Sequence, residues 1–225
     1  MTKSLIESFM DIRGETVSRM LEVKKKGAKV VGVYCTFCPN ELIMAAGAIP
    51  VGLCGTKEDP IPAAEEVLPR NLCALIKSSY GFGATDTCPF FNFSDLIIGE
   101  TTCDGKKKMF EIMQDLKPVH VMQLPHLHNE GASFELWVDE LRKLKARLEK
   151  DFDVEIKDED IWEAIDLVNQ EKRALKEVSD LNQMDPPPLS GLDLLTVIWS
   201  SGFTYDRKEI VDRLNKIKDA LLEEQ

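Results

Sequence analysis

The sequence predicts an α/β protein, namely a Rossmann-like open parallel sheet of about four strands followed by an all-helical segment. Up to about residue 128, short apolar runs alternate with helical patterns, and strands that alternate with helices form parallel sheets. Beyond that point only helical stripes recur, with apolar residues spaced three or four apart. We therefore expect a cysteine-bearing α/β domain over residues 1–128 and a helical segment over residues 129–225.

The expected strands are short, rich in β-branched residues and bounded by turn signals. They lie at 29–34, 49–53, 96–99 and 119–123. His120 falls in the last strand, where a hydrogen-bonded core histidine is expected. Helical patterns precede and separate the strands at 4–26, 39–47, 72–80 and 106–116. Consecutive strands should be joined by right-handed connections.

Composition and charge exclude several classes of function. The chain has 225 residues and a formal net charge of −11. Its longest basic runs, Lys24–Lys26 and Lys106–Lys108, are typical of solvated helix faces and not of nucleic-acid interfaces. No apolar run approaches the roughly 18 residues that span a bilayer, and the first residues lack the apolar core of a secretory signal. We expect a cytoplasmic protein with no nucleic-acid or membrane partner.

The six cysteines are concentrated in the first half of the chain. In a reducing cytosol, cysteines serve metal sites or redox chemistry more often than disulfides. Three of them follow predicted strands, and open α/β sheets bind ligands at the carboxyl ends of their strands. The six are Cys35, Cys38, Cys54, Cys73, Cys88 and Cys103, with Cys35, Cys54 and Cys103 at the strand ends.

The local setting of these cysteines suits a thiolate, but the spacing leaves its use open. Cys35 and Cys38 form a CxxC pair that opens a helix, and Cys103 opens another. A helix N-terminus carries partial positive charge and free N–H groups, which stabilise thiolates and anionic clusters. Soft thiolates select iron–sulfur clusters, zinc or copper(I). A lone CxxC also fits a thiol-redox motif, and buried thiols with no ligand are the plainest alternative.

Longer stretches carry a resemblance to a known family. They are YCTFCPNELIMAAGAIP at 34–50, LPRNLCALIKSSYGFG at 68–83, DLIIGETTCDGKKK at 95–108 and KPVHVMQLP at 117–125. These stretches resemble motifs of the 2-hydroxyacyl-CoA dehydratase D-component family, which includes benzoyl-CoA reductase subunits and double-cubane cluster proteins. Within the family they look most like the double-cubane branch.

The resemblance implies a cofactor and its ligands. The cofactor is an iron–sulfur cluster, either a [4Fe–4S] cubane or a double cubane, and the matching metal ligands are Cys35, Cys73 and Cys103. The resemblance favours Cys38, Cys54 and Cys88 less as metal ligands than these three. Electrons would come from a separate ATP-hydrolysing iron–sulfur activator protein, and the chain itself has no P-loop pattern.

The resemblance also implies a function and a longer protein. The expected function is a reductase component that passes low-potential electrons to a small-molecule substrate within a homo- or heterodimer. One alternative is a 2-hydroxyacyl-CoA dehydratase subunit, which is a lyase. Another is a truncated non-catalytic fragment, or a thiol-redox or zinc protein. Family subunits carry a second Rossmann-like domain that is absent here, so the three cysteines would form half of the cluster's cage.

Overall fold

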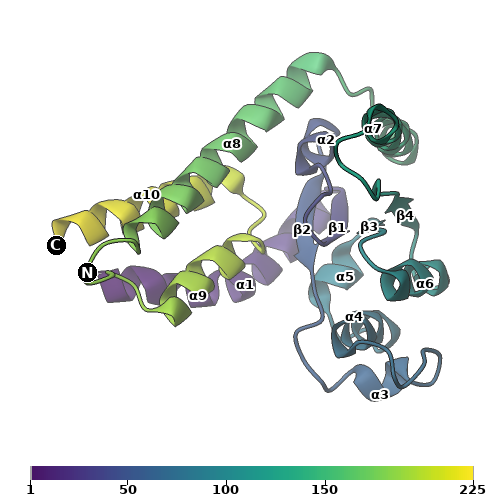
Figure 1. Ribbon diagram of the computed structural model, residues 1–225, viewed down its shortest axis with the longest axis horizontal. Helices are drawn as coiled ribbons and strands as arrows, with labels where there is room; N and C mark the ends of the chain where they lie inside the picture. Colours follow the sequence, from purple (N-terminus) through teal and green to yellow (C-terminus); the bar gives the residue numbers. More distant parts are fainter. Residues whose placement is uncertain (1, 225) are drawn as a thin grey trace.

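The computed structural model describes residues 2–224 and confirms the predicted fold class (Figure 1). Four parallel strands form one sheet in the order β2-β1-β3-β4. Each strand is a short run of mainly apolar residues whose side chains are largely buried. The strands are β1 (Val30–Tyr34), β2 (Ile49–Leu53), β3 (Leu96–Glu100) and β4 (Val119–Met122).

Helices cover both faces of this sheet because each strand points alternate side chains to opposite sides. From β1, Val30 and Tyr34 enter one core, whereas Val31 and Val33 enter the other. The first core lies under α4 (Ala74–Ala84), α5 (Pro89–Phe93) and α6 (Asp104–Met113). The second lies under α2 (Asn40–Ala45) and α7 (Gly131–Phe152). The sheet is therefore the middle layer of three.

Two short helices are not predicted by the sequence pattern. They are α3 (Ile61–Ala64) and α5, and each is too short to show helical periodicity. Proline stands at the first or second helical position of both, where its missing N–H costs nothing. These helices lie on the long connection between β2 and β3, which also carries α4.

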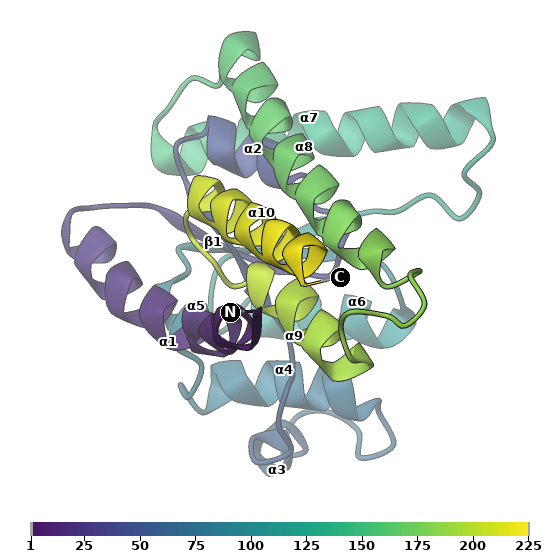
Figure 2. The ribbon, with the colours of Figure 1, turned by 90° about the vertical axis from the view of Figure 1, so that its left-hand side faces the viewer.

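A third core is built almost entirely from helices, with Leu189 from the loop between the eighth and ninth of them. It is formed by α1 (Thr2–Lys25), α8 (Asp158–Leu181), α9 (Gly191–Ser201) and α10 (Arg207–Glu223). Phe9 of α1 lies in this helical core, whereas Met20 of the same helix lies in the core of the sheet. Figures 1 and 2 show the two ends of the described chain close together beside this helical part. Among residues 2–224, no helix is both long and apolar enough to cross a membrane.

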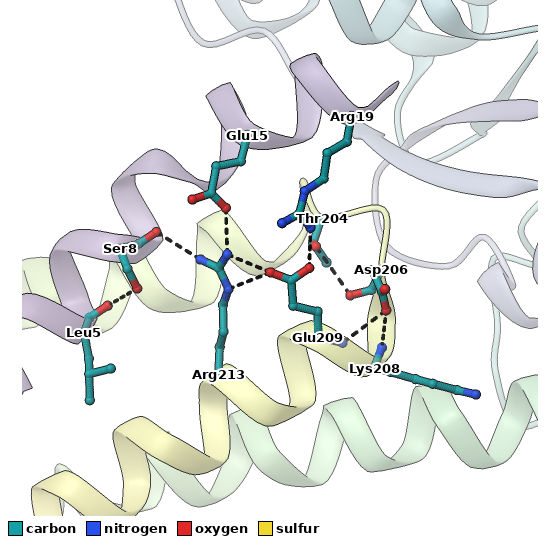
Figure 3. A network of polar contacts seen from close by, with 9 residues as sticks. All are labelled: Leu5, Ser8, Glu15, Arg19, Thr204, Asp206, Lys208, Glu209 and Arg213. Atoms are coloured by element: carbon teal, nitrogen blue, oxygen red, sulfur yellow. Dashed lines mark hydrogen bonds and ion pairs between the residues drawn. The ribbon is translucent and has the colours of Figure 1, made fainter. Parts of the chain in front are cut away.

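Ion pairs and hydrogen bonds of charged side chains connect α1 to α10 at the surface of the helical core (Figure 3). Arg213 donates to Glu15 at 2.6 Å and to Glu209 at 2.7 Å, and it reaches the carbonyl oxygen of Ser8 at 3.3 Å. Glu209 also pairs with Arg19. The first helix of the chain is thus held against the last one by a connected network.

Candidate functional site

The carboxyl edge of the sheet carries cysteines at the ends of three neighbouring strands. β1 ends at Tyr34 and β2 at Leu53, and these two residues are paired in register. Cys35 and Cys54 follow them directly. β3 lies on the other side of β1 and leads to Cys103 at the start of α6. Because parallel strands end at the same edge, the topology brings these three cysteines to one edge of the sheet.

Cys35 has an unusual backbone and a positively charged neighbour. Its φ is 71°, in the left-handed region that non-glycine residues seldom occupy. The Lys106 ammonium contacts the Cys35 sulfur, and the Thr102 hydroxyl lies 3.8 Å from it. Lys106 and Thr102 belong to the segment that runs from β3 into α6. The Cys35 thiol therefore faces the start of α6, with the Lys106 cation beside it.

Glu100, the last residue of β3, is a site residue that the sequence reasoning missed. Its side chain is fully buried, and its Oε1 atom accepts hydrogen bonds from the backbone N–H groups of Phe37 and Cys38, both at 2.6 Å. Burial raises the pKa of this carboxyl, and its Oε2 atom has no hydrogen-bond partner among residues 2–224. The sequence does contain a feature that could have indicated Glu100, namely a carboxylate at the end of an apolar strand, three residues before Cys103.

Cys38, the second cysteine of the CxxC pair, is placed unlike Cys35. Its side chain is 7 % exposed and belongs to the apolar core that α2 and α7 share. Burial raises the pKa of the Cys38 thiol well above its usual range, and the negative charges of Glu100 and Glu41 raise it further. The thiol is therefore held neutral, and neutral thiols are poor metal ligands.

Cys73 and Cys103 each stand immediately before a helix. Cys73 precedes α4 and Cys103 precedes α6, and both are exposed. The two helices begin close together, since a Cβ atom on Gly105 would lie 2.9 Å from Leu72 Cδ1 and 2.7 Å from Ile76 Cδ1. Both thiols are thus next to the unpaired N–H groups and the positive dipole end of a helix.

The two remaining cysteines are Cys54, which directly follows β2, and Cys88, which precedes α5. Partial burial raises the pKa of Cys54, the Lys106 and Arg13 cations act against this shift, and Cys35 adds to it. Burial raises the pKa of Cys88 as well, and the backbone N–H groups at the start of α5 partly offset the effect. Cys54 is therefore an exposed neighbour of Cys35, whereas Cys88 is a half-buried thiol at the start of α5.

The predicted ligands do not form a closed metal site within the described chain. All six cysteines are free thiols. Among residues 2–224, no three side chains of histidine, cysteine, aspartate or glutamate are arranged so that they could hold a metal ion. The donor set fits an iron–sulfur cluster in its chemistry, because Cys35, Cys73 and Cys103 are accessible thiols beside a cation or a helix N-terminus.

The fold and this edge define an open parallel α/β protein with thiols at its strand ends, and comparison with known proteins places the chain more closely. The family model of the 2-hydroxyglutaryl-CoA dehydratase D-component matches residues 35–225. The chain is 48% identical over 212 residues to "Putative dehydratase subunit YjiM" of Escherichia coli (strain K12), covering 94% of this chain and 55% of that protein. This chain therefore belongs to the 2-hydroxyglutaryl-CoA dehydratase D-component family.

More distant relatives include both dehydratase and reductase subunits. The chain is 25% identical over 219 residues to the β subunit of (R)-2-hydroxyglutaryl-CoA dehydratase from Acidaminococcus fermentans, covering 95% of this chain and 57% of that protein. It is 21% identical over 183 residues to one of the subunits of benzoyl-CoA reductase from Thauera aromatica, covering 80% of this chain and 47% of that protein. The chain spans about half the length of these relatives.

Proposed function

We propose that this chain is the iron–sulfur component of a reductase, which receives low-potential electrons from an ATP-dependent activator and passes them to a small substrate. The observation that carries the proposal is that Cys35, Cys73 and Cys103 are accessible thiols, each beside a cation or a helix N-terminus. Family membership supports it, because a benzoyl-CoA reductase subunit is among the relatives.

In this proposal the chain's own residues hold and tune the cofactor. Cys35, Cys73 and Cys103 are the ligands, and an iron–sulfur cluster bound there would supply one-electron transfer. The free N–H groups that begin α4 and α6 favour negative charge on sulfur. Lys106 adds positive charge beside Cys35, and Glu100 holds the backbone that follows Cys35. Such neighbours shift the reduction potential of a cluster.

Anaerobic reconstitution of the purified chain with ferrous iron and sulfide tests the proposal. The wild type should take up iron and acid-labile sulfide together and turn brown. The substitutions Cys35→Ser, Cys73→Ser and Cys103→Ser should each remove most of this uptake, whereas Cys88→Ser should retain it. A wild type that takes up no iron, or three variants with wild-type iron content, would contradict the proposal. Uptake of zinc in preference to iron would favour a zinc site.

A dehydratase subunit is the second candidate, and the names of the relatives favour it. Dehydration causes no net reduction, so it needs only a trace of electrons, whereas a reductase consumes reducing equivalents with every turnover. The assay supplies activator, ATP, a partner subunit and a 2-hydroxyacyl-CoA, and it counts electrons consumed per product. Product formed with almost no electron consumption would assign the dehydratase function and reject the reductase function.

A further inference from the structure

A separate cavity lies where the helical part meets the edge of the sheet. It encloses about 190 Å³ between α1, the end of β2, α5 and the loop after α9. A backbone hydrogen bond connects this loop to β2: the Gly52 N–H donates to the carbonyl oxygen of Gly202 at 3.3 Å. Sites for drug-sized ligands measure about 300–1,000 Å³. This cavity, here called the Arg13 cavity, therefore suits a smaller molecule.

Arg13 supplies the cavity with a cation that two aromatic rings hold in place. Its guanidinium carbon lies 4.9 Å from the ring centre of Trp199 and 4.6 Å from that of Phe203. Contacts with two aromatic rings restrict a side chain that otherwise has many rotamers. Among residues 2–224, no carboxylate or other hydrogen-bond acceptor contacts this half-buried guanidinium. Its five N–H donors are therefore available to a ligand.

The wall of the Arg13 cavity is positively charged, in contrast to the chain as a whole. Lys57 lines it together with Arg13, and within the described chain no aspartate or glutamate does. The Arg13 cation also reaches two thiols of the wall, because it counteracts the effect of burial on the pKa of Cys54 and of Cys88. In a protein with a net charge of −11, a cationic cavity of this kind selects anions.

Threonine, cysteine and apolar residues complete the wall of the Arg13 cavity, and its apolar part narrows the class of anion that fits. Leu53, Phe82 and Phe90 line the same space, and they favour a ligand with an aliphatic part over a purely inorganic ion. We propose that the Arg13 cavity binds a small carboxylate, with its carboxylate group on the Arg13 guanidinium and its short aliphatic part against these apolar side chains. A planar guanidinium matches a carboxylate with two parallel hydrogen bonds. This site requires no iron–sulfur cluster, so it stands apart from the function proposed above.

Isothermal titration calorimetry of the cluster-free chain tests the proposal with sodium butyrate as the probe. The wild type should bind butyrate more tightly than inorganic phosphate or n-butanol. Arg13→Met keeps an apolar stem against the two rings and should weaken butyrate binding by at least about tenfold, the loss expected for a charged hydrogen-bonded contact. Lys29→Met is the matched control, because it removes another cation near an aromatic ring, 5.9 Å from Phe152 and outside the cavity. The butyrate affinity of Lys29→Met should equal that of the wild type.

A second measurement needs no variant. Butyrate in the Arg13 cavity should slow the alkylation of Cys54 by iodoacetamide in the wild type, measured by peptide mass spectrometry, and should leave Cys103 unprotected. Three results would overturn the proposal: no protection of Cys54, unchanged butyrate affinity in Arg13→Met, or binding of n-butanol or phosphate as tight as that of butyrate.

Discussion

At the scale of single residues, the Glu100 carboxylate joins two cysteine segments. It stands at the end of β3, three residues before Cys103. It accepts hydrogen bonds from the backbone N–H groups of Phe37 and Cys38, which lie just before α2. A buried carboxylate costs free energy unless its hydrogen bonds offset the loss of water. The two backbone hydrogen bonds offset part of this cost, and they fix the backbone between Cys35 and Cys38.

Replacing Glu100 with alanine should destabilise the fold and disturb this segment. The backbone N–H groups of Phe37 and Cys38 would lose their acceptor, so we expect the free energy of unfolding in urea to fall by about 1–3 kcal/mol. Glu100→Gln retains an acceptor oxygen and should lose less. Glu111→Ala, on the exposed side of α6, is the control and should change stability by about 0.5 kcal/mol or less. An equal loss in Glu100→Ala and Glu111→Ala would reject this role.

His120 in β4 should make stability depend on pH. Burial, followed by the Arg147 cation, lowers the pKa of this imidazole, and its Nε2 atom has no hydrogen-bond partner among the described residues, contrary to the sequence prediction. Below the ordinary pKa of 6.5, the unfolded chain binds the proton before the folded chain does. Stability is therefore lost as pH falls through that window.

Urea unfolding at pH 7.5 and pH 5.5 measures the effect of His120. The loss of stability on acidification should be smaller in His120→Gln than in the wild type. His126→Gln, on the exposed loop after β4, should keep the wild-type loss. Identical acid sensitivity in His120→Gln and the wild type would show that the histidine does not contribute.

The sequence predicts some residues of the site and not others for a physical reason. Cys35, Cys54 and Cys103 follow strands, and a parallel sheet brings strand ends to one edge whatever its loops do. Glu100 and Arg13 depend on partners from distant segments, namely the peptide units before α2 and the rings of Trp199 and Phe203. Periodicity within one segment contains no information about such contacts.

At the scale of secondary-structure elements, two ion pairs join α8 to α10 in different environments. The Glu171–Arg207 pair is buried, with Arg207 Nη1 at 2.8 Å and 3.0 Å from the two carboxylate oxygens. Burial nevertheless raises the pKa of Glu171, and Arg207 only partly offsets this. The Lys218–Glu177 pair, at 2.9 Å, is more exposed. One helix pair thus contains both a buried ion pair and its surface counterpart.

Breaking these two pairs should have different costs. Glu171→Ala leaves the Arg207 charge buried without its partner and should lower the free energy of unfolding by about 3–5 kcal/mol. Lys218→Ala should cost about 1 kcal/mol or less, because surface pairs are screened by solvent. The double variant Glu171→Leu/Arg207→Leu should recover most of the first loss. Urea unfolding measures all three, and equal costs for the two single variants would contradict the argument.

Sequence patterns predicted the long elements better than the short ones. All four strands and the helices that show clear periodicity lie within a few residues of their expected positions. α3 and α5 are only four and five residues long, so no apolar face repeats within them. The packing of α1 against α9 and α10 was also not predictable, because an amphipathic helix does not specify which neighbour covers its apolar face.

At the scale of the whole molecule, the chain contains three cores that share elements. The sheet separates two of them, and α1, α8, α9 and α10 enclose the third. α1 belongs to two cores, through Phe9 near its beginning and Met20 near its end. The predicted boundary at residue 128 separates the α/β part of the sequence from the helical part. In space the two parts share a core, because α7 follows this boundary and covers one face of the sheet. Stability should therefore be partly local to each core.

Substitutions in different cores should loosen different parts of the molecule. Phe9→Ala and Phe110→Ala each remove a fully buried ring, and each should lower the free energy of unfolding by about 3–5 kcal/mol. Native-state hydrogen exchange distinguishes them, because proteins open in local cooperative units. In Phe9→Ala, exchange should accelerate in α9 and α10 more than in the strands, whereas Phe110→Ala should accelerate the strands more than α9 and α10. If exchange accelerates uniformly in both variants, the three cores unfold as one unit and the helical part has no stability of its own.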